Sequence, residues 1–397
     1  MSEKRRDNRN RILHTGESQR KDGRYAFKFI DANGRQRFIY SWKLVPTDRV
    51  PRGKRECISL REKEKAVQRD LEDGIDHIGK RMTVCQLYDR YVRCRANVRP
   101  GTETGRGQLA RILSEDPLGG LRIDGVKPSD AKGWAMRMSA RGYAYTTVSN
   151  HKRSLKAAFY SAIADDLVRK NPFDFKLSEV IENETKPKVP LSSTQEEALL
   201  SFARTDAVYN RYYDEVVILL GTGLRVSELC GLTASDIDLE ARSIRVDHQL
   251  LRAKGGGYYV AKPKTKCGER VIYMSDDVLD AFRRVVERGG PRNPFVVDGR
   301  RGLLFLNKKG LPRCGQSYAS VFRGMVRKYG KGDRPALPEV MTPHTLRHTF
   351  CTNMANRGMN PKTLQYIMGH SDIKMTLGYY AHATTENAMD EMRRIVA

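Results

Sequence analysis

Near the N-terminus, apolar and polar positions alternate in two short runs that a turn separates. Residues 24–30 read Arg-Tyr-Ala-Phe-Lys-Phe-Ile and residues 35–40 read Arg-Gln-Arg-Phe-Ile-Tyr, with Asn33-Gly34 between them. Alternation on both sides of an Asn-Gly pair predicts a β-hairpin. The charged segment 60–78 contains few helix breakers, so we expect it to form a helix that covers the apolar face of the hairpin.

The two faces of this predicted hairpin differ in chemistry. Successive side chains on a strand point to opposite sides, so Tyr25, Phe27 and Phe29 share one face. That face can pack, while the other can meet the phosphates or base edges of a nucleic acid. The candidate contacts are Arg24, Lys28, Arg35 and Arg37. The alternative is a basic hairpin that is only solvated.

Helical periodicity dominates residues 81–180. Thr83 is placed to cap a helix whose apolar positions are Leu87, Tyr88, Tyr91 and Val92. A second, longer helix is expected over about 146–167, with one apolar stripe made of Val148, Leu155, Phe159 and Ile163. The opposite side is polar and basic, which suits either solvent or phosphate contact. The candidate contacts there are Asn150, Arg153 and Lys156.

A proline-punctuated stretch separates this helical region from the remainder of the chain. Asn171-Pro172 ends the helical pattern, and residues 184–190 read Glu-Thr-Lys-Pro-Lys-Val-Pro. Ser193, with Glu196 three residues later, then predicts a capping box that begins a new helix. We therefore expect three domains, over residues 1–80, 81–180 and 181–397.

The last domain carries both helical and strand patterns. An apolar helix is expected at 216–220, and the segments 243–246 and 270–273 alternate like strands. Between these strands, a lysine-rich segment is expected to surround a hairpin turn that ends near Gly268. Its lysines would share a face if extended, so spacing alone does not choose among Lys262, Lys264 and Lys266.

Composition narrows the class of partner. The chain has 72 Lys+Arg against 47 Asp+Glu, a formal net charge of +25, which favours polyanions such as DNA. No apolar run approaches the ~20 residues that span a bilayer, and no signal peptide is evident. The 7 cysteines are odd in number and scattered, which indicates reduced thiols in a cytoplasm and not a disulfide framework.

Four separated motifs supply candidate chemistry. They are centred on Arg225 in Gly-Thr-Gly-Leu-Arg, on His344 and Arg347 in His-Thr-Leu-Arg, on His370 in Met-Gly-His, and on Tyr379. Arginine forks and imidazoles suit a phosphate whose charge grows during displacement. A tyrosine hydroxyl suits a covalent nucleophile. Together these groups indicate phosphoryl transfer on a nucleic acid.

Other interpretations of the same residues are weaker. Residues 221–223 lack the spacing of a P-loop. His344 and His348 have the spacing of a zinc-binding helix, but a third ligand is missing nearby. We interpret His348 as a packing or supporting residue. Tyr379 and Tyr380 are adjacent, so the residues alone leave the nucleophile open between them.

With these motifs in this order, the sequence resembles the tyrosine recombinases, or phage-type integrases, and most closely the integrases of conjugative transposons. Thr222 to Leu229 match the family's Thr-Gly-Leu-Arg-x-x-Glu-Leu helix, and the later motifs match in order and spacing. The resemblance implies a tyrosine nucleophile nine positions after the Gly-His histidine, which favours Tyr379; the family's Tyr-x-His pattern would favour Tyr380, since His382 follows it. The implied catalytic set is Arg225, Lys264, His344, Arg347, His370 and Tyr379.

The resemblance also implies a fold and an activity. The fold is a small α+β N-terminal arm-binding domain with a three-stranded sheet and a helix, an all-α core-binding domain, and a mainly α catalytic domain with a small antiparallel sheet. The activity is site-specific recombination through a 3′-phosphotyrosine, which integrates and excises a mobile element without a metal or other cofactor. A type IB topoisomerase and a non-catalytic DNA-binding regulator are the alternatives.

The implied partners follow from that activity. They are double-stranded DNA, at core sites around the crossover and at distal arm sites, three further copies of the chain in a tetramer on DNA, and a small excisionase protein. No membrane partner is expected, and the expected compartment is the bacterial cytoplasm, at the nucleoid.

Overall fold

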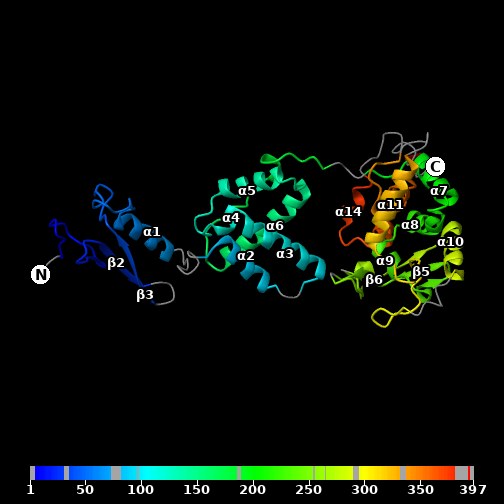
Figure 1. Cartoon of the computed structure of the whole chain (residues 1–397), viewed down its shortest axis with the longest axis horizontal. Coiled ribbons are helices and arrows are strands. Elements are labelled where there is room, and N and C mark those ends of the chain that lie inside the picture. The colour runs from blue at the N-terminus through cyan, green and yellow to red at the C-terminus, as the bar shows by residue number, and fades with distance from the viewer. Residues whose placement is uncertain are drawn as a thin grey trace. The chain divides into compact units, whose positions relative to one another are not determined.

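The computed structural model divides into two compact units, Met1–Lys186 and Pro187–Ala397, whose elements are labelled in Figure 1. The structure describes residues 5–30, 35–72, 82–95, 98–185, 189–253, 255–263, 265–288, 295–330, 337–380 and 392–393. The turn residues Asn33-Gly34, the lysine candidate Lys264 and the Tyr-x-His histidine His382 lie outside these ranges.

The first unit begins with an antiparallel sheet in the order β1-β2-β3. Its strands and the helix that follows are β1 (Glu17–Gln19), β2 (Tyr25–Ile30), β3 (Gln36–Ser41) and α1 (Leu60–Glu72). Tyr25, Phe27 and Phe29 form a core with Leu60 and Val67 of α1. The three-stranded sheet covered by a helix is thus confirmed. The described part of α1 reaches Glu72, and the expected continuation to residue 78 lies outside the described residues.

The helical part of the first unit has its own hydrophobic core. Trp134 packs edge to face on Phe173, which also contacts Phe159, and all three side chains are fully buried. Thr83 caps the first helix through a capping box with Gln86, as the sequence predicts. The elements are α2 (Val84–Arg93), α3 (Pro100–Glu115), α4 (Pro117–Gly120), α5 (Pro128–Ala140), α6 (Tyr145–Ala164) and η2 (Leu177–Glu179).

The N-cap of the first helix in the second unit lies one residue earlier than the sequence suggests. Ser192, not Ser193, is the N-cap of α7 (Ser193–Thr205), and its side chain accepts a hydrogen bond from the backbone N–H of Gln195. The prediction of a Ser193–Glu196 capping box was therefore wrong. Glu196 instead accepts a hydrogen bond from Asn353 Nδ2 at 2.9 Å.

Helix α8 (Tyr213–Thr222) is the central element of this unit and packs against α7, α10 and α12. Apolar residues fill most of its length, because it is enclosed by those helices (Figure 1). The remaining helical elements are η3 (Asn210–Tyr212), α9 (Val226–Gly231), η4 (Ala234–Asp236), α10 (Asp276–Glu287), α11 (Gly315–Tyr329), α12 (Pro343–Asn356), α13 (Pro361–Met368) and α14 (Ile373–Leu377).

Two small antiparallel sheets lie in the second unit. One contains β4 (Ile237–Asp238), β5 (Ser243–Val246) and β8 (Arg270–Tyr273), and the other pairs β6 (Gln249–Arg252) with β7 (Tyr258–Ala261). The strands at 243–246 and 270–273 are confirmed. The hairpin turn is not where we expected it, because it joins β6 to β7, and the segment around Lys262 and Lys266 leads through the short turn η5 (Lys266–Gly268) into β8.

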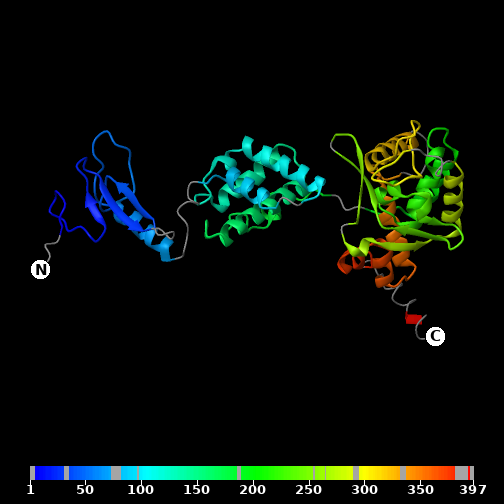
Figure 2. The same ribbon diagram turned by 90° about the horizontal axis from the view of Figure 1, so that it is seen from below.

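The C-terminal helices form a smaller core beside the main one. Phe350 and Cys351 of α12 pack with Leu364 and Met368 of α13, and Tyr379 packs against this cluster. Figures 1 and 2 both show the red α14 next to the orange helices that precede it. Within the described ranges, no helix is both long and apolar enough to cross a lipid bilayer.

Candidate active site

Two helix ends converge on one buried arginine. Helices α8 and α13 each end at a glycine in the left-handed conformation, Gly223 with φ 62° and Gly369 with φ 60°. Arg347 of α12 donates from Nη1 to the carbonyl of Gly223 at 2.6 Å and from Nη2 to the carbonyl of Met368. Helix C-termini carry partial negative charge, so this arrangement stabilises the buried guanidinium.

Burial changes the acid–base behaviour of Arg347. Its side chain is almost completely buried. Burial, together with the nearby charge of Arg225, lowers its pKa to about 9, while Glu228 opposes this shift. The guanidinium is still cationic at neutral pH, and it is poorly compensated by anions. A phosphate that reached it would supply the missing negative charge.

Arg225 stands at the N-cap of α9 and is held from two sides. Its backbone N–H donates to Glu228 Oε2 at 2.8 Å, and its Nη1 donates to Glu228 Oε1 at 2.7 Å. Its Nη2 donates to the carbonyl of Gly369 at 3.0 Å. These two bonds to Glu228 orient the guanidinium of Arg225. The contact with Gly369 joins the first motif to the histidine motif.

Arg270, the first residue of β8, is a buried residue of this network that sequence reasoning missed. It donates to both carboxylate oxygens of Glu228, at 3.2 and 2.9 Å, and to the carbonyls of Gly268 at 3.0 Å and Ile367 at 2.5 Å. Burial alone would raise the pKa of Glu228, but the bonds to Arg270 and the charges of Arg270 and Arg225 lower it to about 2. Arg270 therefore ties α9, β8 and α13 together.

The two candidate histidines lie close enough to influence each other. Burial lowers the pKa of His370 to about 4, and the charges of Arg347, Arg225, Arg270 and His344 lower it further in the same direction. His370 is therefore neutral at pH 7. Its Nδ1 lies 3.0 Å from Thr376 Oγ1, which leaves Nε2 as the nitrogen that can donate to a phosphate. His344, near the start of α12, is exposed.

The two adjacent tyrosines have different surroundings. Tyr380 donates its hydroxyl to the carbonyl of Met359, which anchors it to the protein. Tyr379 is half-buried, and its ring packs against His348 with the centroids 4.8 Å apart. Burial raises the pKa of Tyr379, whereas the charge of Arg347 lowers it. Because His348 follows Arg347 directly on α12, its ring contact places Tyr379 beside the helix that carries Arg347.

The structure thus brings Arg225, His344, Arg347, His370 and Tyr379 into one region. Lys264 lies outside the described residues, while its alternatives Lys262 and Lys266 are exposed. Three guanidinium groups, those of Arg225, Arg270 and Arg347, face a single carboxylate, that of Glu228. An anion with several oxygens, next to a phenol, is what this arrangement can accommodate.

The hairpin candidates do not all lie on one face of the first unit's sheet. The register pairs Lys28 with Phe38 and Ala26 with Tyr40, so these side chains share one face. On that face Lys28, Phe38 and Tyr40 are exposed, whereas Ala26 is buried. Arg37 pairs with Phe29 and therefore belongs to the other face, and Arg35 precedes β3; both side chains are exposed. The sequence could not show this, because the register across the turn was unknown.

Two basic side chains of the first unit lie over aromatic rings near this face of the sheet. Arg24 lies over Tyr40 and Trp42, with 5.5 and 5.7 Å from the guanidinium carbon to the ring centroids. Lys54 Nζ lies 5.3 Å from the centroid of Trp42. Cation–π contacts hold both side chains, and Arg24 is also ion-paired with Asp22 at 2.6 Å. Trp42 and Lys54 were not among the sequence candidates, although the aromatic–basic alternation pointed to this face.

The candidates on α6 also differ from one another. Asn150 and Arg153 are exposed, with Arg153 Nη1 3.5 Å from Asn150 Oδ1. Lys156 forms an ion pair with Asp174 at 2.5 Å. A phosphate would have to compete with Asp174 for Lys156, so the exposed pair is the better placed for phosphate contact.

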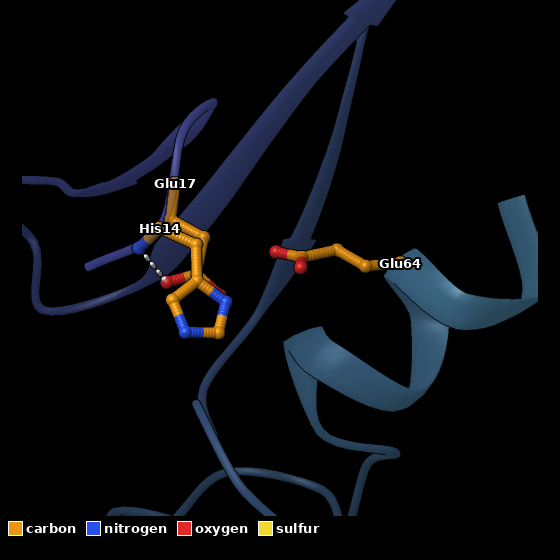
Figure 3. A group of neighbouring side chains, drawn as sticks. All are labelled: His14, Glu17 and Glu64. Carbon is orange, nitrogen blue, oxygen red and sulfur yellow. Dashed lines mark hydrogen bonds and ion pairs between the residues drawn. The ribbon is translucent and has the colours of Figure 1, made fainter. Parts of the chain in front are cut away.

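Among the described residues, two clusters have the residue types of a metal site. In the first, His14 and Glu17 face Glu64 of α1 (Figure 3), and the Oε1 of Glu64 is buried without a hydrogen-bond partner. Glu17, however, already accepts two bonds from Arg61, at 2.9 and 3.2 Å. A metal ion there would adjoin a guanidinium, so the cluster fits a buried ion pair better.

The second cluster contains Asp236, Asp247 and His248. Asp236 Oδ2 accepts from the backbone and hydroxyl of Thr233, and the His248 ring contacts the carbonyl of Gly231 at 2.6 Å and Asp247 at 2.5 Å. These side chains are committed to protein partners, and the cluster holds the end of α9 against the β5–β6 connection.

Two family models match the sequence. Residues 1–71 match the DNA-binding domain of Tn916 integrase, and residues 190–387 match the phage integrase family. The chain is 58% identical over 395 residues to the transposase from transposon Tn916 of Enterococcus faecalis, a match that covers 100% of this chain and 97% of that protein.

Solved structures match as well. One is the Tn1549 transposon integrase, residues 82–397 with R225K, in complex with a circular intermediate DNA. It is 56% identical with a TM-score of 0.76, and the match covers 79% of this chain and 99% of that chain. Another is the same integrase with Y379F in complex with transposon right end DNA, which is 56% identical with a TM-score of 0.75 over 80% of this chain and 100% of that one.

Proposed function

The chain belongs to the phage integrase family of tyrosine recombinases and is a site-specific DNA recombinase, and we propose that it integrates and excises a mobile element such as a conjugative transposon. The observation that carries this proposal is the convergence of Arg225, Arg347 and His370 beside Tyr379. Relatives named as a transposon's transposase and as integrases bound to transposon DNA support it.

In the proposed reaction, the Oη of Tyr379 attacks a DNA phosphate. A bond forms between that oxygen and phosphorus, the bond from phosphorus to the 5′ oxygen breaks, and a 3′-phosphotyrosine results. Because the fold raises the pKa of Tyr379, its proton needs an acceptor, and exposed His344 is the proposed one. Lys264 donates a proton to the departing 5′ oxygen. Attack by a 5′ hydroxyl from the second duplex reverses these steps and joins new strands.

The phosphate is held by preorganised donors. Arg225 and Arg347 bind the non-bridging oxygens, and neutral His370 donates a hydrogen bond from Nε2. Such electrostatic stabilisation of developing charge is often the largest contribution to catalysis. The energy of the broken DNA bond is kept in the phosphotyrosine, so the mechanism uses no nucleotide, metal or other cofactor.

The proposed division of labour follows three segments. Residues 1–80 bind arm sites through the exposed face of the sheet, residues 81–180 bind core sites through a surface that includes α6, and residues 181–397 catalyse. Separate hydrophobic cores in the sheet and helical parts support the first boundary. The division between the compact units at Lys186 and Pro187 supports the second.

The proposed assembly is a tetramer on two duplexes. Each of the four copies supplies one Tyr379, and strands are exchanged in pairs, with a small excisionase protein as an accessory partner. The substrate places this reaction at the nucleoid in the bacterial cytoplasm.

Trapping the covalent intermediate tests the chemistry. A nicked duplex carrying a transposon end loses a short fragment on cleavage, so the phosphotyrosine adduct accumulates. We expect an adduct with the wild-type chain and with Tyr380→Phe, and none with Tyr379→Phe, although all three bind DNA. An adduct that persists in Tyr379→Phe and disappears in Tyr380→Phe would reverse the nucleophile assignment. Intermolecular strand exchange, as opposed to relaxation alone, separates the recombinase from a topoisomerase.

A further inference from the structure

His348 lies between the phosphate-binding arginine and the nucleophile, and the proposed mechanism gives it no role. It follows Arg347 directly on α12 and is half-buried. Its ring meets the ring of Tyr379 at 4.8 Å between centroids with an interplanar angle of 75°, an edge-to-face contact. Its Nδ1 lies 3.4 Å from the hydroxyl of Thr352, one turn further along the same helix.

The helix that carries His348 is fixed from several directions. Arg347 is bonded to the ends of α8 and α13. Two residues further along α12, Thr349 Oγ1 accepts a hydrogen bond from the backbone N–H of Leu191 at 2.9 Å. Phe350 and Cys351 are buried in the C-terminal cluster. The backbone at residue 348 therefore cannot shift independently of the guanidinium at residue 347.

Tyr379 comes from a different part of the chain. It follows α14, a helix of 5 residues, and its backbone N–H donates to Thr376 at 3.0 Å. An edge-to-face contact restricts the rotation and tilt of both rings because the edge of one ring is attracted to the face of the other. His348 thus connects the fixed position of α12 to the phenol ring of Tyr379.

We propose that His348 is a positioning residue, whose ring sets the orientation of the Tyr379 phenol relative to the phosphate held by Arg347. This inference rests on the proposed function, because it assumes that Tyr379 is the nucleophile. In-line attack requires the nucleophilic oxygen at near-contact distance and in line with the leaving group, so a small misplacement is costly in rate. The role belongs to the ring, and it needs no proton transfer by the imidazole.

A matched pair of substitutions separates the ring from the imidazole chemistry. His348→Phe keeps a planar ring and removes both nitrogens, and His348→Leu fills a similar volume without a ring. Both are made in the full chain and compared with wild type on the nicked substrate. The readouts are the single-turnover rate of adduct formation at saturating protein, the DNA dissociation constant, and the dependence of the rate on pH.

We expect His348→Leu to slow adduct formation about tenfold or more, by analogy with other small misplacements of reacting groups, with an unchanged dissociation constant. We expect His348→Phe to stay within about threefold of wild type and to keep the same pH profile, because the edge-to-face contact survives. A slower rate with unchanged affinity in His348→Leu, together with a near-native rate in His348→Phe, would support a positioning role for the ring.

Three outcomes overturn the inference. They are a wild-type rate in His348→Leu, an equal loss in both variants, and a loss in His348→Leu that weaker DNA binding accounts for. An equal loss together with an altered pH profile assigns the imidazole an acid–base or charge role instead. If the wild-type chain forms no adduct on this substrate, the proposed function fails, and that failure is visible before either variant is compared.

Discussion

The guanidinium of Arg225 donates to the backbone carbonyl of Gly369, which lies 144 positions later in the chain, at 3.0 Å. Gly369 has a φ of 60°, and a side chain there would meet Arg270 Nη1 and the carbonyl of Cys267, both at 3.1 Å. The Gly-His motif is therefore not only a carrier of His370. Its glycine lets the end of α13 approach the first arginine closely enough to hold it.

Replacing Arg225 with lysine should test whether geometry or charge matters at this position. Lysine keeps the charge, but a single ammonium does not reproduce the contacts to Glu228 and Gly369 while also presenting a fork to a phosphate. We expect Arg225→Lys to lower the single-turnover rate of adduct formation by about 10²–10³. Arg242→Lys, at a surface ion pair with Asp276, is the control. A near-native rate for Arg225→Lys would place this residue away from the phosphate.

Removing Arg270 should destabilise the second unit. Arg270→Met leaves the buried carboxylate of Glu228 without its main partner, and breaking a buried pair costs about 3–5 kcal/mol. Chemical denaturation of the full chain measures the change in the free energy of unfolding. Adding Glu228→Gln should recover part of the stability, because it removes the orphaned charge, but it should not restore the cleavage rate.

The control for this prediction is Arg283→Met, which breaks an exposed pair with Asp280. That change should cost no more than about 1 kcal/mol, since exposed pairs contribute little. Equal losses for Arg270→Met and Arg283→Met would show that the Arg270 network does not stabilise the fold.

The sequence predicts those site residues that stand in short contiguous motifs, and it misses those whose partners lie far away along the chain. Arg225, His344, Arg347 and His370 each stand in a short contiguous motif, so the order of motifs identified them. Arg270 has no such motif. Its importance comes from the carbonyl of Ile367, 97 positions away, and from Glu228, 42 positions away, and only the folded chain brings these together.

The errors in the fold have equally local causes. Ser192 and Ser193 are each followed, three residues later, by a residue that can complete a capping box, and backbone geometry decides between them. The hairpin at β6–β7 was assigned to the wrong loop because the lysine-rich segment also reads as extended. The face of Arg37 depends on pairing across a turn, which composition does not determine.

The two faces of the N-terminal sheet should contribute unequally to DNA binding. We expect Lys28→Gln to weaken arm-site binding and to reduce its salt dependence by about one counterion, because Lys28 lies on the exposed face. Arg37→Gln, on the opposite face, should change both less. Filter binding of arm-site DNA across a salt series measures this, and deletion of residues 1–80 supplies the baseline. Equal effects of the two substitutions would contradict the one-face interpretation.

Glu64 should make the N-terminal sheet less stable at alkaline pH. Burial and the charge of Glu17 raise the pKa of Glu64 from 4.5 to about 7, so its ionised form is disfavoured in the fold. The loss of stability is therefore absent below about pH 4.5, grows as the pH rises from 4.5 to about 7, and is complete above the folded pKa. Asp7 and Asp48, whose pKa values are lowered despite burial because Arg11 bonds to both, lose their stabilising effect at acid pH.

Hydrogen exchange of the sheet and α1 amides in the full chain, at pH 5.5 and pH 8, measures this dependence. We expect protection to fall between these pH values in wild type beyond the intrinsic change in exchange rate. Glu64→Gln should remove this fall, whereas Glu56→Gln, at an exposed pair with Lys43, should keep it. An unchanged slope in Glu64→Gln would assign the pH dependence to other groups.

The convergence of distant segments on Arg347 has a consequence for the chain while it is being synthesised. A nascent polypeptide that ends before Met341 holds Arg225 and Glu228, but it lacks the second arginine, both histidines and the tyrosine. The N-terminal sheet, which we propose to bind arm sites, is synthesised first. In the proposed mechanism, such a truncated product can bind the element's ends but cannot cleave a strand, because the groups proposed to cleave DNA are synthesised last.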